Sequence, residues 1–166
     1  MNDRNKENLK LPDYSFEKIT DITPGFVRRA GANAVAFDLD NTVTHYGSLR
    51  LEPGIDKWLE SMRAAGIKLI IVSNTITPRA YWFSKKMNSI PFIAPAFKPS
   101  SISLKLASKM LGEAPENILM VGDKVSTDVK AANKIGATSV KIVPLTKRRN
   151  AAMPEYAPYM TLSRAD

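Results

Sequence analysis

The stretch that decides the fold is AVAFDLDNTVT, residues 34–44, where an apolar run ends abruptly in charge. The run is short, rich in residues that favour β-structure and bounded by Gly31, which is typical of a buried strand. Asp38 and Asp40 follow it with one residue between them, and Thr42 stands two positions further along. Two carboxylates so close together repel each other, so their position at a strand end calls for a compensating partner such as a cation.

Four further apolar runs have the character of buried strands, and they lie at residues 68–74, 90–95, 117–123 and 138–143. Helical patterns separate the runs, at residues 55–65, 78–87, 102–111 and 125–135. Strands that are apolar throughout and joined by helices indicate a parallel sheet with helices on both faces. The sequence therefore predicts an α/β fold, a Rossmann-like three-layer sandwich with a five-stranded parallel sheet.

The length and composition fit one globular domain. The chain has 166 residues, of which 44% are hydrophobic and 24% are charged. We divide it into an N-terminal peripheral segment (1–30), a core (31–146) and a basic, proline-containing tail (147–166). The chain has no cysteine, which excludes disulfides, zinc-thiolate sites and cysteine nucleophiles.

The formal net charge of +8 favours anionic partners: nucleic acid, anionic lipid headgroups or phosphorylated small molecules. Charge alone does not choose among them. The opening residues lack the apolar core of a signal peptide, and no apolar run approaches the length of a membrane span. We therefore expect a cytoplasmic protein, and peripheral contact with the inner face of the membrane is an open alternative.

Polar residues stand at the ends of several predicted strands. In an open parallel sheet, ligands bind beyond the carboxyl ends of the strands, so these side chains are expected to converge on one rim. The residues concerned are Asp38 and Asp40, Ser73 and Asn74, Lys98 shortly after the third strand, and Asp123 with Asp128 a turn later.

Such a rim suits phosphate chemistry. Carboxylates without histidine or cysteine favour a hard ion such as Mg²⁺, which leaves positions open for a substrate phosphate. Lys98 can neutralise a phosphate oxygen, and the Ser73 hydroxyl can donate to it. An aspartate can attack phosphorus to form an aspartyl-phosphate, while the carboxyl two residues away moves protons.

These residues resemble the motifs of the haloacid dehalogenase superfamily of phosphohydrolases. The resemblance covers about residues 33–143 and consists, in order, of DLDNT, VSN, FKPS and GDKVSTD. It implies that Asp38 is the nucleophile, that Asp40 is the general acid/base and a magnesium ligand through its backbone carbonyl, and that Asp123 is a further ligand. It also implies that Ser73, Asn74 and Lys98 bind the phosphoryl group, with Thr42 and Asp128 in support; Asp128 would orient Lys98 or the waters of the metal.

Many members of this superfamily carry an inserted cap domain. Here only 32 residues separate Asp40 from Ser73, and 24 separate Ser73 from Lys98, so no cap is expected and the chain resembles the capless subclass III. An open site admits a bulky substrate, or one presented by a macromolecule or a membrane. Within this group the motifs look most like those of the YqeG-type phosphatases, which are related to the phosphatidylglycerophosphate phosphatases.

The function predicted from the sequence is a Mg²⁺-dependent phosphomonoester phosphatase that acts through an aspartyl-phosphate, on phosphatidylglycerophosphate or another bulky phosphorylated substrate. One alternative is a phosphatase of nucleotides or soluble phosphometabolites. A phospho-accepting receiver module needs an acid on the third strand, and residues 90–95 offer none. A basic nucleic-acid-binding protein with a vestigial site would be retained on RNA in a salt-dependent way, and we favour it less.

Three features have roles that the sequence leaves open. His45, the single histidine, lies just beyond the first motif and suits substrate contact or plain exposure better than catalysis. The segment Tyr81-Trp82-Phe83 fits either a membrane-facing patch or a core-facing helix side. The basic run at residues 147–149 either steers an anion or is a solvated tail, and the oligomeric state is also open.

Overall fold

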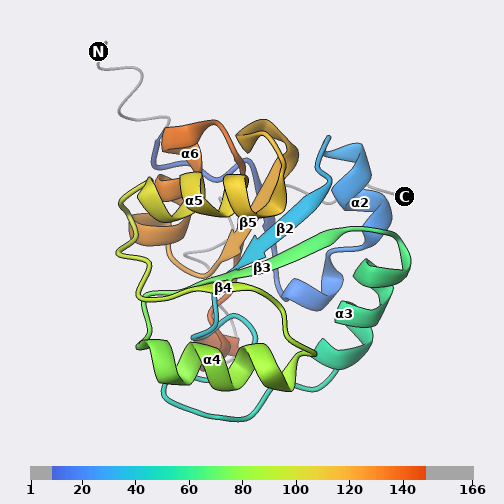
Figure 1. Cartoon of the computed structure of the whole chain (residues 1–166), viewed down its shortest axis with the longest axis vertical. Helices are drawn as coiled ribbons and strands as arrows, with labels where there is room; N and C mark the ends of the chain where they lie inside the picture. The colour runs from blue at the N-terminus through green and yellow to red at the C-terminus, as the bar shows by residue number, and fades with distance from the viewer. Residues whose placement is uncertain (1–8, 149–166) are drawn as a thin grey trace.

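The computed structural model describes residues 9–148 as a three-layer α/β sandwich (Figure 1). Six parallel strands form one sheet in the order β1-β6-β5-β2-β3-β4. The strands are β1 (Tyr14–Phe16), β2 (Ala34–Phe37), β3 (Lys68–Val72), β4 (Phe92–Ile93), β5 (Ile118–Gly122) and β6 (Thr138–Ile142). The helices are α2 (Pro24–Arg29), α3 (Ile55–Ala64), α4 (Thr77–Lys86), α5 (Ile102–Leu111), α6 (Lys130–Ile135) and α7 (Leu145–Arg148).

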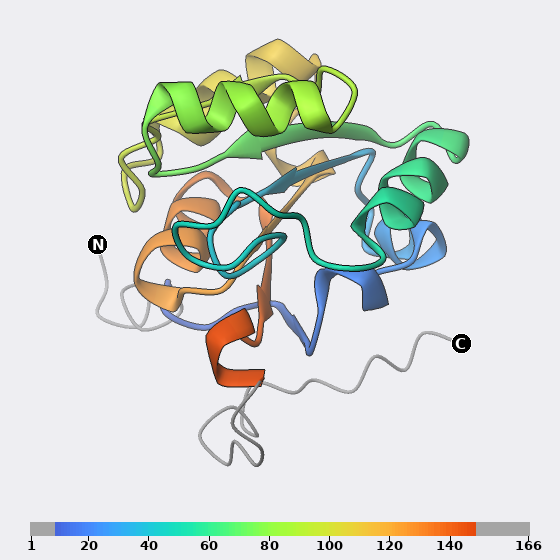
Figure 2. The same ribbon diagram turned by 90° about the horizontal axis from the view of Figure 1, so that it is seen from below.

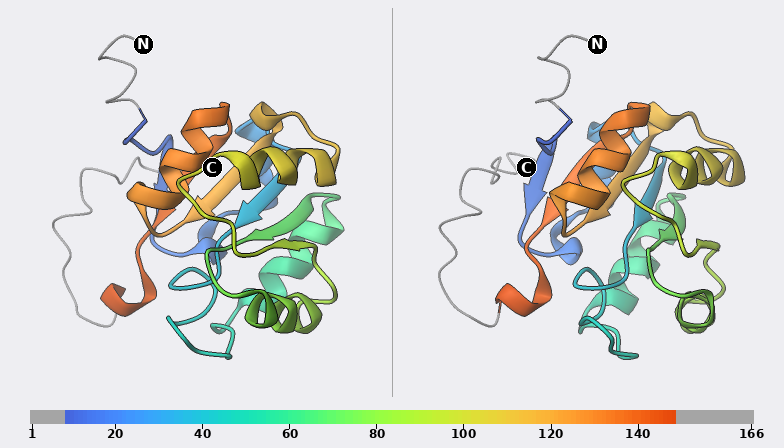
Figure 3. Two further views of the ribbon diagram at one scale, coloured as in Figure 1. Left: turned by 60° about the vertical axis from the view of Figure 1, so that its left-hand side comes forward. Right: turned by 90° about the vertical axis from the view of Figure 1, so that its left-hand side faces the viewer.

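Both faces of the sheet are buried, as the continuous apolar strands predict. Successive residues of β2 alternate between two cores: Val35 and Phe37 pack with α2, α3 and α4, whereas Ala34 and Ala36 pack with α5 and α6. Figure 3 shows α5 and α6 on one side of the sheet and α3 and α4 on the other. The α/β sandwich is confirmed.

The prediction of five strands was wrong, because the sheet has a sixth strand, β1, at its edge. β1 pairs with β6, and Tyr14 lies opposite Val140. A three-residue strand with a polar residue at its centre is too short to give a periodic signal, so it cannot be predicted from the sequence pattern. The segment predicted as peripheral, residues 1–30, thus contributes a strand and a helix, and Phe16 and Phe26 belong to the core.

The segments that follow β2 and β3 contain loops and single helices, and no inserted domain occurs within residues 9–148. After β2 the chain forms a loop, residues 44–51, which we call the flap; Figure 2 shows it beside α4. The Thr44 hydroxyl holds the flap by donating to the Arg50 carbonyl at 2.6 Å. At the ends of the flap, His45 Nε2 lies 2.9 Å from Oε1 of Glu52, the residue that follows the flap.

Two further findings concern predicted segments. The helix expected at residues 125–135 begins as a π-helical turn, Val125–Val129, and becomes regular only in α6. Among the described helices, none has the length and apolarity that crossing a bilayer requires. The predicted tail at residues 147–166 lies outside the described residues, apart from the backbone of the last two residues of α7.

Candidate active site

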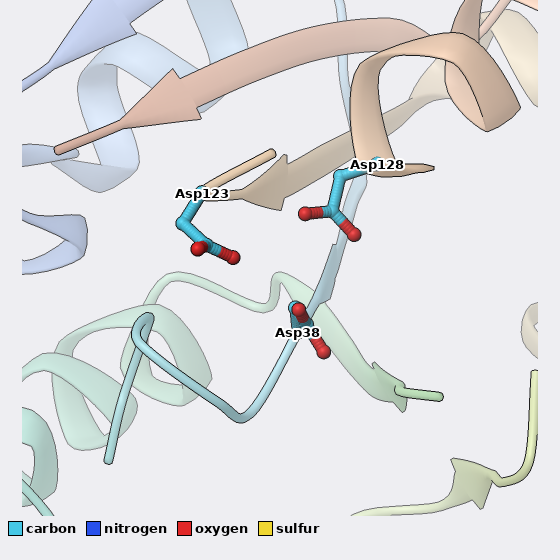
Figure 4. A group of neighbouring side chains, drawn as sticks. All are labelled: Asp38, Asp123 and Asp128. Atoms are coloured by element: carbon cyan, nitrogen blue, oxygen red, sulfur yellow. The ribbon is translucent and has the colours of Figure 1, made fainter. Parts of the chain in front are cut away.

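Three carboxylates gather at the carboxyl ends of the central strands (Figure 4). Asp38 follows β2 and Asp123 follows β5; because these strands are parallel neighbours, the two aspartates emerge side by side. The Asp38 amide donates to the Val121 carbonyl at 3.0 Å and continues the pairing. Asp128 reaches back from the π-helical turn, and one carboxylate oxygen from each aspartate lies within 4.8 Å of the others.

Because Gly122 has no side chain, the Asp128 carboxylate can pack directly against its backbone. A Cβ atom on Gly122 would lie 2.1 Å from Cγ and Oδ2 of Asp128, so any larger residue collides with the carboxylate. Oδ2 of Asp128 accepts the Lys124 amide at 3.1 Å, which fixes the side chain at the start of the turn. Asp128 is 1% exposed, so its carboxylate is buried.

Lys98 lies between two of the carboxylates. Its Nζ is 2.6 Å from Asp128 Oδ1 and 3.3 Å from Asp38 Oδ1, and it donates to the Val72 carbonyl at 2.7 Å. Burial by itself lowers the pKa of Lys98, but the charges of Asp128 and Asp38 outweigh it and leave the pKa above its ordinary value. Lys98 therefore carries its positive charge in the cleft.

Asn74 clamps the backbone of Lys98. Its Oδ1 accepts the Lys98 amide at 2.8 Å, and its Nδ2 donates to the Lys98 carbonyl at 2.9 Å. The neighbouring residue Ser73 is buried, and its hydroxyl oxygen accepts the Thr75 amide at 3.2 Å. Because that bond uses a lone pair, the single hydroxyl proton of Ser73 is left to donate to another group.

The acidic cluster holds more negative charge than Lys98 balances. Burial, then Asp128 and Asp38, raise the pKa of Asp123 to about 7. Burial also raises the pKa of Asp128 to about 6, with Lys98 opposing the rise and Asp38 adding to it. A divalent cation would relieve this repulsion, and a donor set made only of oxygen atoms suits Mg²⁺. The residues present therefore fit a magnesium ion.

Asp40 stands apart from this cluster. Its Oδ2 accepts from Arg79 Nη1 at 2.8 Å, and its Oδ1 accepts from the Gly47 amide, in the flap, at 3.1 Å. Arg79 was not predicted from the sequence, because 39 positions separate it from Asp40 and no spacing or periodicity links the two. The one available signal was its place in the first turn of the helix that follows Ser73.

The predicted residues share one cleft of about 460 Å³, with two exceptions, Asp128 and Thr42. The cleft is lined by Asp38, Asp40, Ser73, Asn74, Lys98 and Asp123, together with Arg79, Tyr46 and Ile76. Asp128 does not line the cleft, but its Oδ1 pairs with Lys98 Nζ, which does. Thr42 lines a separate cavity of about 180 Å³, and its buried Oγ1 has no hydrogen-bond partner among the described residues.

Comparisons with known proteins identify phosphatases among the relatives of this chain. A family model described as "HAD-hyrolase-like" matches residues 96–159. The chain is 33% identical over 135 residues to the probable phosphatase YqeG of Bacillus subtilis, covering 81% of this chain and 78% of that protein. It is 28% identical over 149 residues to the chloroplastic phosphatidylglycerophosphate phosphatase 1 of Chlamydomonas reinhardtii, covering 84% of this chain but only 55% of that protein.

Solved structures show the same fold. A HAD-superfamily hydrolase from Ehrlichia chaffeensis superposes with a TM-score of 0.60 at 17% identity, over 72% of this chain and 95% of that one. The cobalt-bound deoxy-D-mannose-octulosonate 8-phosphate phosphatase of Haemophilus influenzae gives a TM-score of 0.55 at 14% identity, over 72% and 75% of the two chains.

The curated relatives and the matching family model place the chain among phosphatases of the haloacid dehalogenase class, and the fold agrees. Within that class, the match to the Bacillus protein is long and close enough to show the family: the chain belongs to the YqeG phosphatase family of the haloacid dehalogenase superfamily.

Proposed function

We propose that the protein hydrolyses phosphomonoesters with Mg²⁺ through an aspartyl-phosphate formed on Asp38. The observation that carries this proposal is the position of Asp38, whose carboxylate lies beside the charged Nζ of Lys98 and beside Asp123 in an open cleft. A phosphoryl group placed there meets a nucleophile and a cation together, which is the arrangement that phosphoryl transfer requires.

The reaction proceeds in two displacements. An Asp38 oxygen bonds to phosphorus while the bond between phosphorus and the leaving oxygen breaks. The leaving oxygen keeps the electron pair of the broken bond and receives a proton from the protonated Asp40 carboxyl. A water molecule then gives a proton to Asp40 and bonds to phosphorus, and the electron pair of the broken acyl-phosphate bond returns to Asp38. Lys98 and the Ser73 hydroxyl hold the phosphoryl oxygens throughout.

Asp38, Asp123 and the backbone carbonyl of Asp40 hold the magnesium ion in this proposal, and Asp128 keeps Lys98 in place through their ion pair. The ion neutralises the phosphate and the carboxylates, so the negative nucleophile can approach a negative substrate. Asn74 supports the site by fixing the Lys98 backbone. Its side-chain amide has a second N–H, and we propose that this donor binds the phosphoryl group while the first stays on the Lys98 carbonyl.

The rim of the cleft favours a substrate with an apolar part, such as a phospholipid. Tyr46, Ile76 and Phe97 are 76%, 67% and 72% exposed; the first two line the cleft, and Phe97 precedes Lys98. Large exposed apolar residues around an open site suit a membrane-bound substrate. Phosphatidylglycerophosphate, the substrate named for the algal relative, is therefore our first candidate.

A neighbouring surface supports peripheral contact with an anionic membrane, and we propose that this contact is on the cytoplasmic side. Tyr81 and Trp82 are exposed on α4, and the ammonium groups of Lys85 and Lys86 lie 5.4 and 4.5 Å from their ring centroids. Aromatic rings beside lysines suit the headgroup region of anionic lipids. Phe83 is fully buried, so this third aromatic of the segment belongs to the core.

A phosphatase of nucleotides or soluble phosphometabolites is the second candidate. A cleft without an inserted domain within residues 9–148 also admits small substrates. A phosphoglycolate phosphatase of Aquifex aeolicus is 29% identical over 124 residues, covering 68% of this chain and 54% of that protein.

Hydrolysis of p-nitrophenyl phosphate by the wild type and by Asp38→Asn, with and without Mg²⁺, tests the proposed chemistry. We expect turnover only by the wild type with the metal, and equal rates for both proteins would refute the mechanism. Phosphate release from phosphatidylglycerophosphate and from nucleoside monophosphates then separates the two substrate classes. Salt-sensitive retention on RNA without any turnover would instead favour the nucleic-acid-binding alternative.

A further inference from the structure

Arg79 joins three segments that meet at the cleft. Its Nη1 donates to Asp40 Oδ2 at 2.8 Å and to Thr75 Oγ1 at 3.2 Å. Its Nη2 donates to the backbone carbonyl of Ser48, in the flap, at 2.7 Å. The guanidinium carbon lies 5.2 Å from the ring centroid of Phe83. One side chain thus connects the loop after β2, the flap and the loop after β3.

This position is costly for an arginine unless Asp40 accompanies it. The Arg79 side chain is 12% exposed and has lost most of its hydration. Its Nε is buried without a hydrogen-bond partner in the described part of the chain. It also lies in the first turn of α4, where the helix dipole disfavours a cation. A role in the cleft, as the partner of Asp40, therefore explains the position of Arg79 better than a contribution to the stability of α4 does.

The contacts also fix the direction of the Asp40 carboxylate. Arg79 holds Oδ2 and the Gly47 amide holds Oδ1, so rotation of the carboxylate breaks at least one of these bonds. Each oxygen keeps a further lone pair, and Asp40 lines the cleft. A general acid works only when its proton is within hydrogen-bond reach of the leaving oxygen, so this orientation bears directly on the rate.

We propose that Arg79 is the positioning residue for Asp40: it orients the carboxyl that protonates the leaving oxygen and ties that orientation to the position of the flap. The inference rests on the proposed function, in which the proton of Asp40 passes to the leaving oxygen as its bond to phosphorus breaks. Lysine cannot replace Arg79 here, because an ammonium group lacks the planar fork that reaches Asp40 and Ser48 together.

The dependence of the first displacement on the leaving group tests this role. An alkyl phosphate needs a proton on its departing oxygen, whereas 2,4-dinitrophenyl phosphate releases a stable anion without one. In single-turnover measurements, Arg79→Met should slow transfer from the alkyl phosphate that the wild type hydrolyses fastest by about 10- to 100-fold. It should slow transfer from the dinitrophenyl ester by less than about threefold.

Two comparisons separate positioning from a general structural effect. In an Asp40→Asn background, Arg79→Met should lower the single-turnover rate with the alkyl phosphate by less than about a further threefold, because this variant no longer has the acid that Arg79 orients. Arg79→Lys keeps the positive charge and the aliphatic stem, and it should show the same dependence on the leaving group as Arg79→Met. Arg50→Met, at an exposed arginine of the same flap, is the matched control and should leave both rates unchanged.

The outcomes are distinct. A loss confined to the alkyl phosphate and absent in the Asp40→Asn background supports the role of Arg79. Equal losses with both esters in Arg79→Met and Arg79→Lys, or losses that multiply with that of Asp40→Asn, overturn it. Failure of the proposed function looks different: Asp38→Asn would then keep the wild-type rate, and this inference would fall with that mechanism.

Discussion

Gly122→Ala places one methyl group where the structure has no room for it. The added Cβ would lie 2.1 Å from Cγ and Oδ2 of Asp128 and 2.5 Å from its Cβ, whereas real Cβ contacts essentially never fall below 3.0 Å. The nearest atoms belong to a short, buried side chain, which cannot swing aside as the end of an exposed lysine would. Asp128 or the end of β5 must therefore move by roughly 1 Å.

The size of the effect follows from what Asp128 holds. Overpacking costs about 1–3 kcal/mol, and displacing one partner of a buried ion pair costs about 3–5 kcal/mol when the pair is lost outright. Part of the pair with Lys98 survives a small shift, so we expect the free energy of unfolding to fall by about 3 kcal/mol. Because Lys98 moves with Asp128, we also expect kcat to fall by about 100-fold.

Urea unfolding and hydrolysis of p-nitrophenyl phosphate measure these two effects. Gly25→Ala is the matched control: its Cβ would come no nearer than 3.2 Å, to the flexible end of Arg29, and its change in stability should stay within about 0.5 kcal/mol. If Gly122→Ala unfolds within about 0.5 kcal/mol of the wild type and keeps its kcat, then Asp128 does not depend on this close approach and the reasoning is wrong.

The remaining predictions concern the clamp, the acidic cluster and the membrane surface. Asn74→Ala removes both hydrogen bonds to the Lys98 backbone and should lower the free energy of unfolding, measured in urea, by about 1–3 kcal/mol. A change near zero would mean that the loop carrying Lys98 keeps its conformation without Asn74. Chelation of divalent metal should abolish turnover, and added Mg²⁺ should restore it. The folded pKa of Asp123, about 7, lies above its ordinary 3.8, so the stability from its protonated form is present at low pH and is lost as pH rises through 7. In EDTA, therefore, thermal stability should fall between about pH 4 and pH 7 and level off above that, Asp123→Asn should flatten this dependence, and a fall of equal size in that variant would contradict the assignment. Trp82→Ser should weaken co-sedimentation with phosphatidylglycerol vesicles, and unchanged binding would speak against docking through α4.

Much of the site was predictable because its residues stand at strand ends. Asp38, Ser73 and Asp123 each follow an apolar run, and a parallel sheet brings the carboxyl ends of its strands to one edge. Their convergence needs no knowledge of individual contacts. The structure places them in one cleft with Lys98, as the pattern predicts.

The sequence by itself determined the alternation of strands and helices, because the period of buried residues along each segment is a local property. It could not reveal β1, whose three residues carry no period and acquire their role only by pairing with β6. It also placed Thr42 with the site, whereas the turn after β2 directs this residue to a separate cavity. The hydrogen bonds of Arg79 to Asp40 and of Asn74 to Lys98 join residues that are far apart in the sequence. Only the packing of α4 and the loops against the sheet decided them, since such contacts depend on where whole elements come to lie in space.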